Sequence, residues 1–307
     1  MSIITLTTDF GIKDHFVGAV KGTIYSELPD ARIVDISHQI SPFNITETAY
    51  ILRNAYKKFP DGSIHIIGVD AELNDENRHI AIKLDNHYFI CPDNGVISLL
   101  ASEITPEKIV EINIHEYIES SFPVLDVFVK VACHIARGGK LEIIGKTIPE
   151  FKKISELQPT ISADNNTIMG NIIYVDNYGN SISNISEKLF GQVGKGRDFE
   201  VIANRYTFSK IYEKYSDIVD FSLPKEQRQK DGTRLALFNS ANFLEISIYR
   251  SNASTVGTRG GRLTKETIPE IRAIHSPNRA TTCRINTNRR AYFSLVTFSG
   301  IASGSGM

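Results

Sequence analysis

The chain has 307 residues, of which 41% are hydrophobic and 22% are charged, and its formal net charge is −1 at pH 7. These values are typical of a globular protein with a large core, and the balanced charge indicates neither a nucleic-acid nor a membrane partner. No apolar run approaches the roughly 20 residues that a membrane helix needs, and no basic segment precedes the first apolar run. Three widely spaced cysteines, Cys91, Cys133 and Cys283, favour reduced thiols in the cytoplasm over a disulfide framework or a zinc site.

The first 155 residues alternate between strand and helix patterns, which predicts an α/β N-terminal domain with a mostly parallel central sheet. Apolar blocks such as residues 64–67 are typical of strands that are covered on both faces. Residues 46–59 place Ala49, Leu52, Ala55 and Tyr56 at helical spacing. The expected strands are residues 3–6, 32–36, 63–69, 79–84, 87–91 and 108–112, and the expected helices are residues 13–28, 46–59 and 124–137.

Three acidic residues, Asp9, Asp35 and Asp70, each come where an expected strand ends. Ligands of parallel sheets bind at the carboxyl ends of the strands, so this edge is the first candidate site. The stretch Asp35-Ile-Ser-His38 is either a weak metal candidate or a strand end whose polar groups bind the backbone. No phosphate-binding loop, dinucleotide fingerprint or nucleophile elbow is present.

After about residue 160 the pattern changes to short apolar runs between polar turns, which predicts a small all-β domain over residues 164–254. Pro149 and Pro159 interrupt the pattern and indicate the boundary within residues 148–163. The expected strands here are residues 171–175, 199–202, 206–209, 234–238 and 243–248.

Residues 255–307 form a basic tail with no clear strand or helix period. From residue 251 onward there are seven Arg and one Lys against two Glu, which gives about +6 by count. Three interpretations stay open: a solvated basic extension, a basic arm for nucleic acid, or a segment that follows a frame change in the coding sequence. The arm is the weakest of them because interleaved aromatic residues are lacking, and we draw no function from the tail.

Several stretches in a set order resemble the S-adenosyl-L-methionine (SAM) hydroxide adenosyltransferases, which are relatives of the fluorinase and chlorinase enzymes. The resemblance covers roughly residues 3–254 and depends on the set rather than on one motif. The stretches are TTDFGIKDHFVGAVKG, IVDISHQISPFNITETAYIL, GVDAELNDENRHIAI, CPDNGVISLL, YVDNYGNSISNIS and LFNSANFLEISIYRSNAS.

The resemblance implies an α/β domain joined to a small β-barrel, in a cytoplasmic homotrimer whose SAM site lies between the N-terminal domain of one subunit and the C-terminal domain of the next. It implies no cofactor, because SAM is the substrate or ligand, and no metal. In the first domain, Asp9 would bind the ribose hydroxyls, Asp14 would face the methionine ammonium, and Phe43 would pack beside the ribose and sulfonium.

The resemblance also assigns roles in the β domain. Asp176 would hold the ammonium, Tyr178 would stack near the adenine ring, and Asn180 would read the adenine edge. Ser240 would touch the methionine carboxylate, while the backbone of Asn252 and Ala253 would meet the adenine. Each residue also has an ordinary structural explanation: Asp14 as a neighbour of a helix cap, Asn180 as a turn residue and Phe43 as core.

Hydrolases of the family orient the attacking water with an Asp–Arg–His constellation, from which this chain departs. The Asp is present as Asp70, but Asn77 stands at the Arg position and Pro123 at the His position. Leu125 replaces a further Arg, and the turn after Asp70 is altered to Ala71-Glu72-Leu73-Asn74.

Neighbouring residues could compensate for these losses. Arg78 lies one residue beyond the lost Arg, and in an extended segment this shift places its side chain on the opposite face. Arg78 therefore serves the site only if the loop of residues 71–77 is re-registered. Glu72 is an alternative carboxylate, whereas His134 is expected to be an ordinary helix residue.

Two hypotheses remain from different classes of function. The first is a divergent SAM hydrolase that forms adenosine and methionine. The second is a catalytically silent protein that binds SAM or adenosine. A halogenase is the weakest alternative, because Leu73 falls where halogenases present a hydroxyl.

Overall fold

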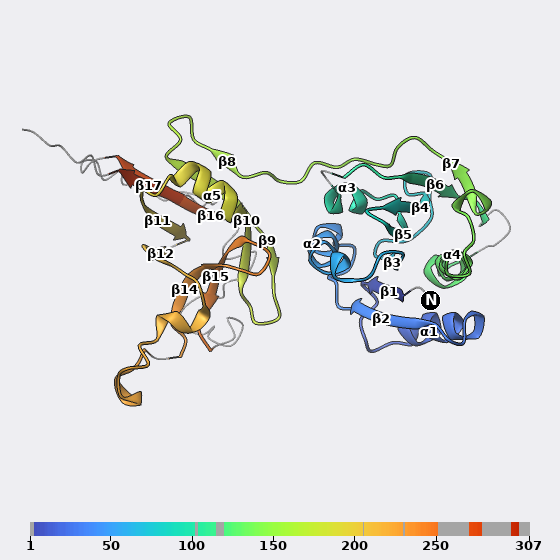
Figure 1. Ribbon diagram of the computed structural model, residues 1–307, viewed down its shortest axis with the longest axis horizontal. Coiled ribbons are helices and arrows are strands. Elements are labelled where there is room, and N and C mark those ends of the chain that lie inside the picture. The colour runs from blue at the N-terminus through green and yellow to red at the C-terminus, as the bar shows by residue number, and fades with distance from the viewer. Residues whose placement is uncertain are drawn as a thin grey trace, which may run out of the picture. The chain divides into compact units, whose positions relative to one another are not determined.

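The computed structural model describes residues 3–101, 104–114, 120–204, 206–229, 231–250, 270–277 and 296–300. The chain folds into two compact units, Met1–Glu156 and Leu157–Met307, and Figure 1 shows the elements of each. None of the helices in the described part of the chain has the length and apolar character that crossing a bilayer requires. Cys91 and Cys133 are buried free thiols, and Cys283 lies outside the described residues.

The first unit is built on one mixed sheet with the strand order β2-β1-β3-β5-β4-β6-β7. The pairings β2–β1, β1–β3 and β3–β5 are parallel, and the pairings β5–β4, β4–β6 and β6–β7 are antiparallel. The expected α/β class with a parallel core is confirmed. The strands are β1 (Ile3–Thr8), β2 (Arg32–Ser37), β3 (Ile64–Gly68), β4 (His79–Leu84), β5 (His87–Pro92), β6 (Lys108–Ile112) and β7 (Gly145–Thr147).

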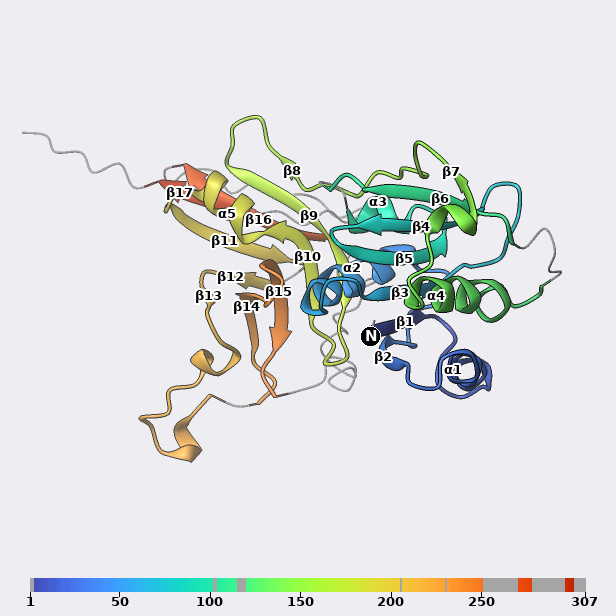
Figure 2. The same cartoon turned by 45° about the vertical axis from the view of Figure 1, so that its right-hand side comes forward.

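Helices cover both faces of this sheet, as Figures 1 and 2 show. The helices are α1 (Phe16–Glu27), α2 (Ile45–Ala55), α3 (Val96–Leu100) and α4 (Val129–Ala136). Val20 and Ile24 of α1 share a core with α4, whereas Leu52 of α2 shares the opposite core with α3. Successive side chains of a strand point alternately into the two cores: Ala81 of β4 faces the first core, and Ile80 and Ile82 face the second. Burial on both faces explains the apolar blocks in the sequence.

Two of the expected helices differ in detail from the observed ones. The helix α2 begins after Asn44, whose side chain accepts a hydrogen bond from the N–H of Glu47 at 3.0 Å and so caps the first turn. It is followed by a short 3-10 turn, Tyr56–Lys58. The expected helix over residues 124–137 is a π-helical turn, Val124–Phe128, that continues into α4.

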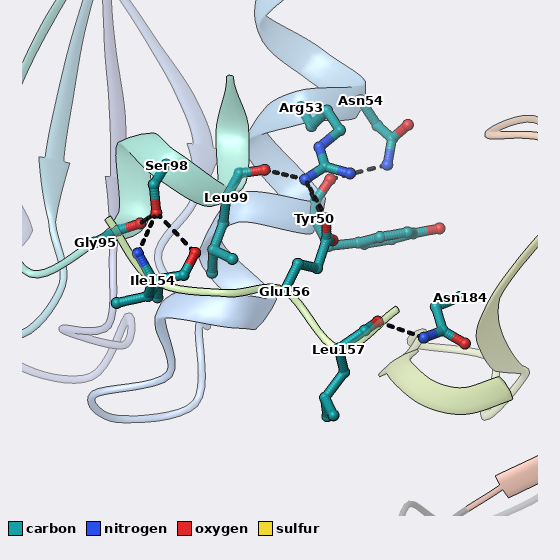
Figure 3. Close-up of polar contacts among 10 residues, drawn as sticks. All are labelled: Tyr50, Arg53, Asn54, Gly95, Ser98, Leu99, Ile154, Glu156, Leu157 and Asn184. Atoms are coloured by element: carbon teal, nitrogen blue, oxygen red, sulfur yellow. Dashed lines mark hydrogen bonds and ion pairs between the residues drawn. The ribbon is translucent and has the colours of Figure 1, made fainter. Parts of the chain in front are cut away.

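The segment that leaves β7 is tied to the first unit up to Glu156, as Figure 3 shows. The N–H of Ile154 donates to the hydroxyl of Ser98 at 3.0 Å, and the guanidinium of Arg53 reaches both the carbonyl of Leu99 and the carboxylate of Glu156. The side chain of Ile154 lies over Gly95, whose φ is +102°, and a Cβ there would meet Ile154 at 2.8 Å. Glycine therefore suits this position for its backbone and for space.

The second unit is a mostly antiparallel β domain, as expected. Its core contains apolar residues of β9, β10, β11, β14 and β15. The only helix among its described residues that is longer than a turn is α5 (Glu187–Gly194), which begins after the capping residue Ser186. The strands are β8 (Thr160–Ile161), β9 (Thr167–Val175), β10 (Ser181–Ser186), β11 (Asp198–Ala203), β12 (Tyr206–Phe208), β13 (Ile211–Tyr212), β14 (Arg234–Phe238), β15 (Phe243–Ile248), β16 (Glu270–Pro277) and β17 (Val296–Gly300).

Two strands of this unit come from the basic tail, where the sequence pattern indicated none. The strand β16 pairs with β9 and β17 pairs with β11, both antiparallel, and β16 and β17 run parallel to each other. Ile271 and Ala273 of β16 belong to the core of the unit. Part of the tail is therefore integral to the β domain.

Candidate ligand-binding and active site

The first unit has a cavity of about 720 Å³ where β1 and β3 end. These strands are parallel neighbours, with Thr8 paired to Gly68, so the residues that follow them meet at one edge of the sheet. Asp9 and Asp70 both reach the cavity from these turns. The lining residues are Asp9, Phe10, Phe43, Asp70, Ala71, Glu72, Leu73, His79, Ser120, Ser121, Phe122, Pro123, Val124 and Val127.

The charged side chains that line this cavity are acidic. Asp9, Asp70 and Glu72 contribute three carboxylates, and no Lys or Arg is among the described residues that line it. Such a lining favours a cationic ligand over an anionic one, because an anion would meet only like charges.

Asp9 is held in place by the turn that precedes α2. Its Oδ2 accepts a hydrogen bond of 2.9 Å from the backbone N–H of Phe43. Phe43 has a φ of +63°, and 71% of its surface is exposed, so it is not the core residue of the ordinary explanation. An aromatic side chain kept at a cavity wall in a sparsely populated backbone conformation is typical of a ligand contact.

The end of β1, just before Asp9, is supported by a polar network in which Thr8 and His38 are buried and Asp35 is exposed. Nδ1 of His38 lies 2.8 Å from the hydroxyl of Thr8, and Nε2 lies 3.1 Å from the carboxylate of Asp35, which also pairs with Lys21. Gly11 donates its N–H to the carbonyl of His38. Burial raises the pKa of Asp35, but hydrogen bonds and charge from Lys21 and His38 outweigh it and hold the pKa below its ordinary value. Among the described residues, no group of three His, Cys, Asp or Glu could hold a metal ion.

Two of the departures from the expected constellation, Asn77 and Pro123, lie near Asp70, but only Pro123 lines the cavity. Pro123 lines the cavity and offers no polar side chain there. Asn77 is buried and does not line the cavity; its amide donates to the carbonyls of Asp70 and Glu72, each at 2.9 Å.

Arg78 is directed away from the cavity, as its position next to Asn77 in an extended segment predicted. Its guanidinium bonds Asp93 at 2.8 Å, Glu111 at 3.3 Å and the carbonyl of Glu150 at 3.0 Å. Arg78 therefore does not line the cavity with Asp70. His134 is also remote from the cavity lining, and its Nε2 lies 3.0 Å from the carbonyl of Lys140.

The second unit has its own cavity of about 690 Å³ beside the turn from β9 to β10. The carboxylate of Asp176 accepts hydrogen bonds of 2.9 Å from the N–H groups of Tyr178 and Asn180 and from the side-chain amide of Asn180. These contacts also close the turn, so Asp176 has a structural role there. The lining residues are Asp176, Asn177, Tyr178, Asn180, Tyr215, Ile248, Tyr249 and Arg250.

A buried carboxylate lies under this second cavity. Glu245 accepts a hydrogen bond of 2.9 Å from the hydroxyl of Tyr215 and another from Ser247. Burial raises the pKa of Glu245, and the nearby charge of Asp176 adds to this effect. This contact holds Tyr215 at the cavity wall, where Tyr249 also lies, whereas the sequence had indicated only Tyr178 as an aromatic contact.

Two expected site residues, Asp14 and Ser240, line neither cavity. Asp14 is exposed before α1, and Ser240 is exposed in the turn between β14 and β15. Asn252 and Ala253 lie outside the described residues.

His79 is the titratable residue of the cavity lining that was not expected from the sequence. It lies two positions after Asn77, so the alternation that excluded Arg78 directs His79 to the same side as Asn77. Its Nε2 lies 3.0 Å from the carbonyl of Ala71, and its ring packs edge-on against Phe128 at 4.8 Å. Alternation along the segment thus accounts for Asn77 and His79 both reaching the carbonyls of the turn at Asp70.

Comparison with known proteins agrees with this arrangement of two units. Residues 4–145 match the SAM hydroxide adenosyltransferase N-terminal domain, and residues 170–259 match the C-terminal domain of the same family. The (R)-S-adenosyl-L-methionine hydrolase of Methanocaldococcus jannaschii is 33% identical over 262 residues, which are 83% of this chain and 91% of that protein. A fluorinase of Nocardia brasiliensis is 22% identical over 279 residues, which are 80% of this chain and 89% of that protein.

A solved structure shows the same fold. The uncharacterized conserved protein from Thermotoga maritima superimposes with a TM-score of 0.73 at 29% identity, covering 88% of this chain and 98% of that one. The two domain matches together span most of the chain and agree with its division into two units. The chain belongs to the SAM hydroxide adenosyltransferase family.

Proposed function

We propose that this protein hydrolyses SAM to adenosine and methionine by attack of water on the ribose C5′. The observation that carries the proposal is the acidic cavity at the ends of β1 and β3, which Asp9 and Asp70 line together. SAM is a sulfonium that also bears an ammonium, so a cavity with three carboxylates and no described cation suits its charge.

The reaction is a displacement at carbon. The water oxygen forms a bond to C5′ while the bond from C5′ to sulfur breaks, and the electron pair of that bond stays on sulfur. The products are adenosine, neutral methionine thioether and one proton. Because the leaving group is already cationic, the protein needs mainly to align the water and to limit bulk solvent around it.

Four residues of the first unit have roles in the proposed reaction. Asp9 accepts hydrogen bonds from the two ribose hydroxyls, for which a carboxylate is suited because it has several acceptor sites and no donor. Phe43 packs against the ribose and sulfonium. Asp70 accepts a hydrogen bond from the attacking water and orients a lone pair toward C5′. Asp14 is assigned to the methionine ammonium by the resemblance alone.

In the proposed homotrimer, the second unit of the next subunit would supply the remaining contacts of the ligand, as the resemblance implies. Asp176 meets the ammonium, Tyr178 stacks on the adenine and Asn180 reads its edge. Tyr215 is added as a second aromatic contact because it lines the same cavity as these three. Ser240, Asn252 and Ala253 keep the roles that the resemblance implies. The homotrimer and the cytoplasmic location also remain predictions, and light scattering of the purified protein tests the first of them.

A catalytically silent SAM-binding protein is the second candidate, and a specific observation favours it. The Arg and His that the family hydrolases use are replaced by Asn77, whose amide is engaged with the backbone, and by Pro123. Asp70 therefore has no cationic partner among the described residues of the cavity.

One experiment separates the two candidates. Purified protein and its Asp70→Ala variant are each incubated with SAM, binding is measured by calorimetry, and adenosine and methionine are quantified by chromatography. The hydrolase predicts turnover in the wild type only, with affinity in the variant kept within a few-fold. Binding without turnover in the wild type would establish the silent binder instead.

A further inference from the structure

The backbone that carries Asp70 is held by side chains rather than by the usual hydrogen bonds of a turn. Four consecutive carbonyls each accept a hydrogen bond from a buried side chain elsewhere in the first unit. The carbonyl of Val69 accepts from Nδ2 of Asn94 at 3.1 Å, those of Asp70 and Glu72 from Nδ2 of Asn77 at 2.9 Å each, and that of Ala71 from Nε2 of His79 at 3.0 Å. We refer to Asn77, His79 and Asn94 as the carbonyl clamp.

The chemistry of the acceptors fixes the orientation of each clamp side chain. A carbonyl oxygen can only accept, so Nε2 of His79 carries a proton and the amide nitrogen of Asn77 faces the turn. The clamp residues are almost fully buried, with 8%, 0% and 8% of their surfaces exposed for Asn77, His79 and Asn94. Buried hydrogen bonds of this kind are costly to leave unmade, so they constrain the turn strongly.

The turn needs such a constraint. Asp70 has a φ of +50°, in the left-handed region that non-glycine residues rarely occupy. A residue in this region persists where its surroundings hold it, and such strain is concentrated at functional sites. Here the clamp holds the residues on both sides of Asp70, and Asp70 itself reaches the cavity.

We propose that Asn77 and His79, together with Asn94, are positioning residues that fix the Asp70 carboxylate at the attacking water. This inference rests on the proposed hydrolase function. In this chain the residue at the Arg position contributes two hydrogen bonds to the turn instead of a positive charge to the cavity. Asp70 is then aligned through its backbone, and the clamp affects the chemical step through the position of Asp70.

The test compares two leucine variants and one conservative variant. Asn77→Leu has nearly the same shape without donors, and His79→Leu removes the imidazole donor, whereas His79→Gln keeps an N–H at similar reach. We expect kcat to fall about 10- to 100-fold in the two leucine variants, with KM within about threefold, because Asp9 and the ribose contacts lie on another turn. We expect His79→Gln to recover most of kcat. Equal loss in His79→Gln and His79→Leu, or a loss confined to KM, would overturn the proposal.

Asn54→Leu is the matched control, because Asn54 also donates from Nδ2 to a carbonyl, that of Tyr50 at 2.8 Å, but lies exposed on α2. Its kcat should equal that of the wild type. A fall of the same size in Asn54→Leu would show that any lost side-chain hydrogen bond lowers kcat, and would contradict a positioning role.

Nuclear magnetic resonance tests whether the carbonyl clamp positions Asp70, and this test does not require an active wild type. The carboxyl-carbon resonance of Asp70 is assigned by its loss in Asp70→Asn, and the imidazole nitrogens of His79 report which one carries the proton. We expect Nε2 of His79 to be protonated and the Asp70 resonance to move in Asn77→Leu but not in Asn54→Leu. A proton on Nδ1 alone, or an unmoved resonance in Asn77→Leu, would disprove the clamp. An inactive wild type with these signals intact would refute only the hydrolase function.

Discussion

The carboxylate of Asp9 accepts a hydrogen bond of 2.9 Å from the N–H of Phe43 and so joins the turn after β1 to the turn before α2. This contact places a hydrogen-bond acceptor and an exposed aromatic ring at one wall of the same cavity. Both residues come from segments far apart in the sequence, and the parallel sheet brings those segments to one edge. The first prediction concerns this pair.

Asp9→Ala should weaken SAM binding about 10- to 100-fold. The change removes the carboxylate that accepts hydrogen bonds from the ribose, and hydrogen bonds to a charged group are worth about 1.5–3 kcal/mol. It also releases the N–H of Phe43. Calorimetric titration measures the effect, and Asp30→Ala, at an exposed acidic residue outside the cavity, is the control. An unchanged affinity in Asp9→Ala would remove Asp9 from the site.

Asp176→Asn should separate the charge of Asp176 from its role in the turn. The amide oxygen still accepts from the N–H groups of Tyr178 and Asn180, but the amide nitrogen cannot accept from the side chain of Asn180, so the free energy of unfolding should fall by about 1–2 kcal/mol. SAM affinity should fall about tenfold because the ammonium loses its counter-charge. Denaturant unfolding and calorimetry give the two values. Full affinity with a large loss of stability would leave Asp176 only the structural role.

Arg78→Ala should lower stability and spare the chemistry. Arg78 pairs with the carboxylate of Asp93, which is 5% exposed, and does not line the cavity. Removing Arg78 leaves the carboxylate of Asp93 with the hydrogen bond from the N–H of Lys152, so we expect a loss of about 2 kcal/mol in denaturant unfolding. The kcat of the folded variant should match the wild type, and a collapse of kcat would show that Arg78 does replace the missing Arg.

Stability should fall as the pH decreases from about 6.5 toward 3. His65 is buried beside Thr5 and His87, and burial, with a contribution from His87, lowers its pKa to about 3. The unfolded chain binds a proton at this site below pH ~6.5 and the folded chain does not, so each pH unit costs about 1.4 kcal/mol. The contribution is therefore fully present above the unfolded pKa and is lost toward the folded one.

Urea unfolding at several pH values measures this slope. His65→Gln should remove the part that His65 contributes, and His15→Gln, at an exposed position, should leave the slope unchanged. A wild-type slope that persists in His65→Gln would contradict the assignment.

The elements predicted best were those whose pattern is set by burial. The strands β1, β3, β4 and β5 appear as apolar blocks because both faces of the sheet are covered, and Asp9 and Asp70 then follow from where those blocks end. The strand β16 was not predicted, because it is defined by pairing with β9, about 100 residues earlier in the chain, rather than by a local pattern.

The turn at Asp70 could not have been predicted from its own residues. Ala71, Glu72 and Leu73 are not typical turn residues, although Asn74 follows them. The carbonyls of the turn are bound instead by side chains such as that of Asn94, which follows β5. The expectation for Arg78 was met because alternation along an extended segment is a local rule. The same rule places His79 on the side of Asn77, and both side chains bond carbonyls of the turn at Asp70.

The central claim is that water attacks C5′ of SAM in this protein, and labelled water tests it most directly. The wild type and Asp70→Asn are incubated with SAM in water that carries heavy oxygen, and the products are weighed by mass spectrometry. The account predicts adenosine with one heavy oxygen, methionine with none, and no labelled adenosine from Asp70→Asn. Unlabelled adenosine, or equal labelled product from both proteins, would contradict it.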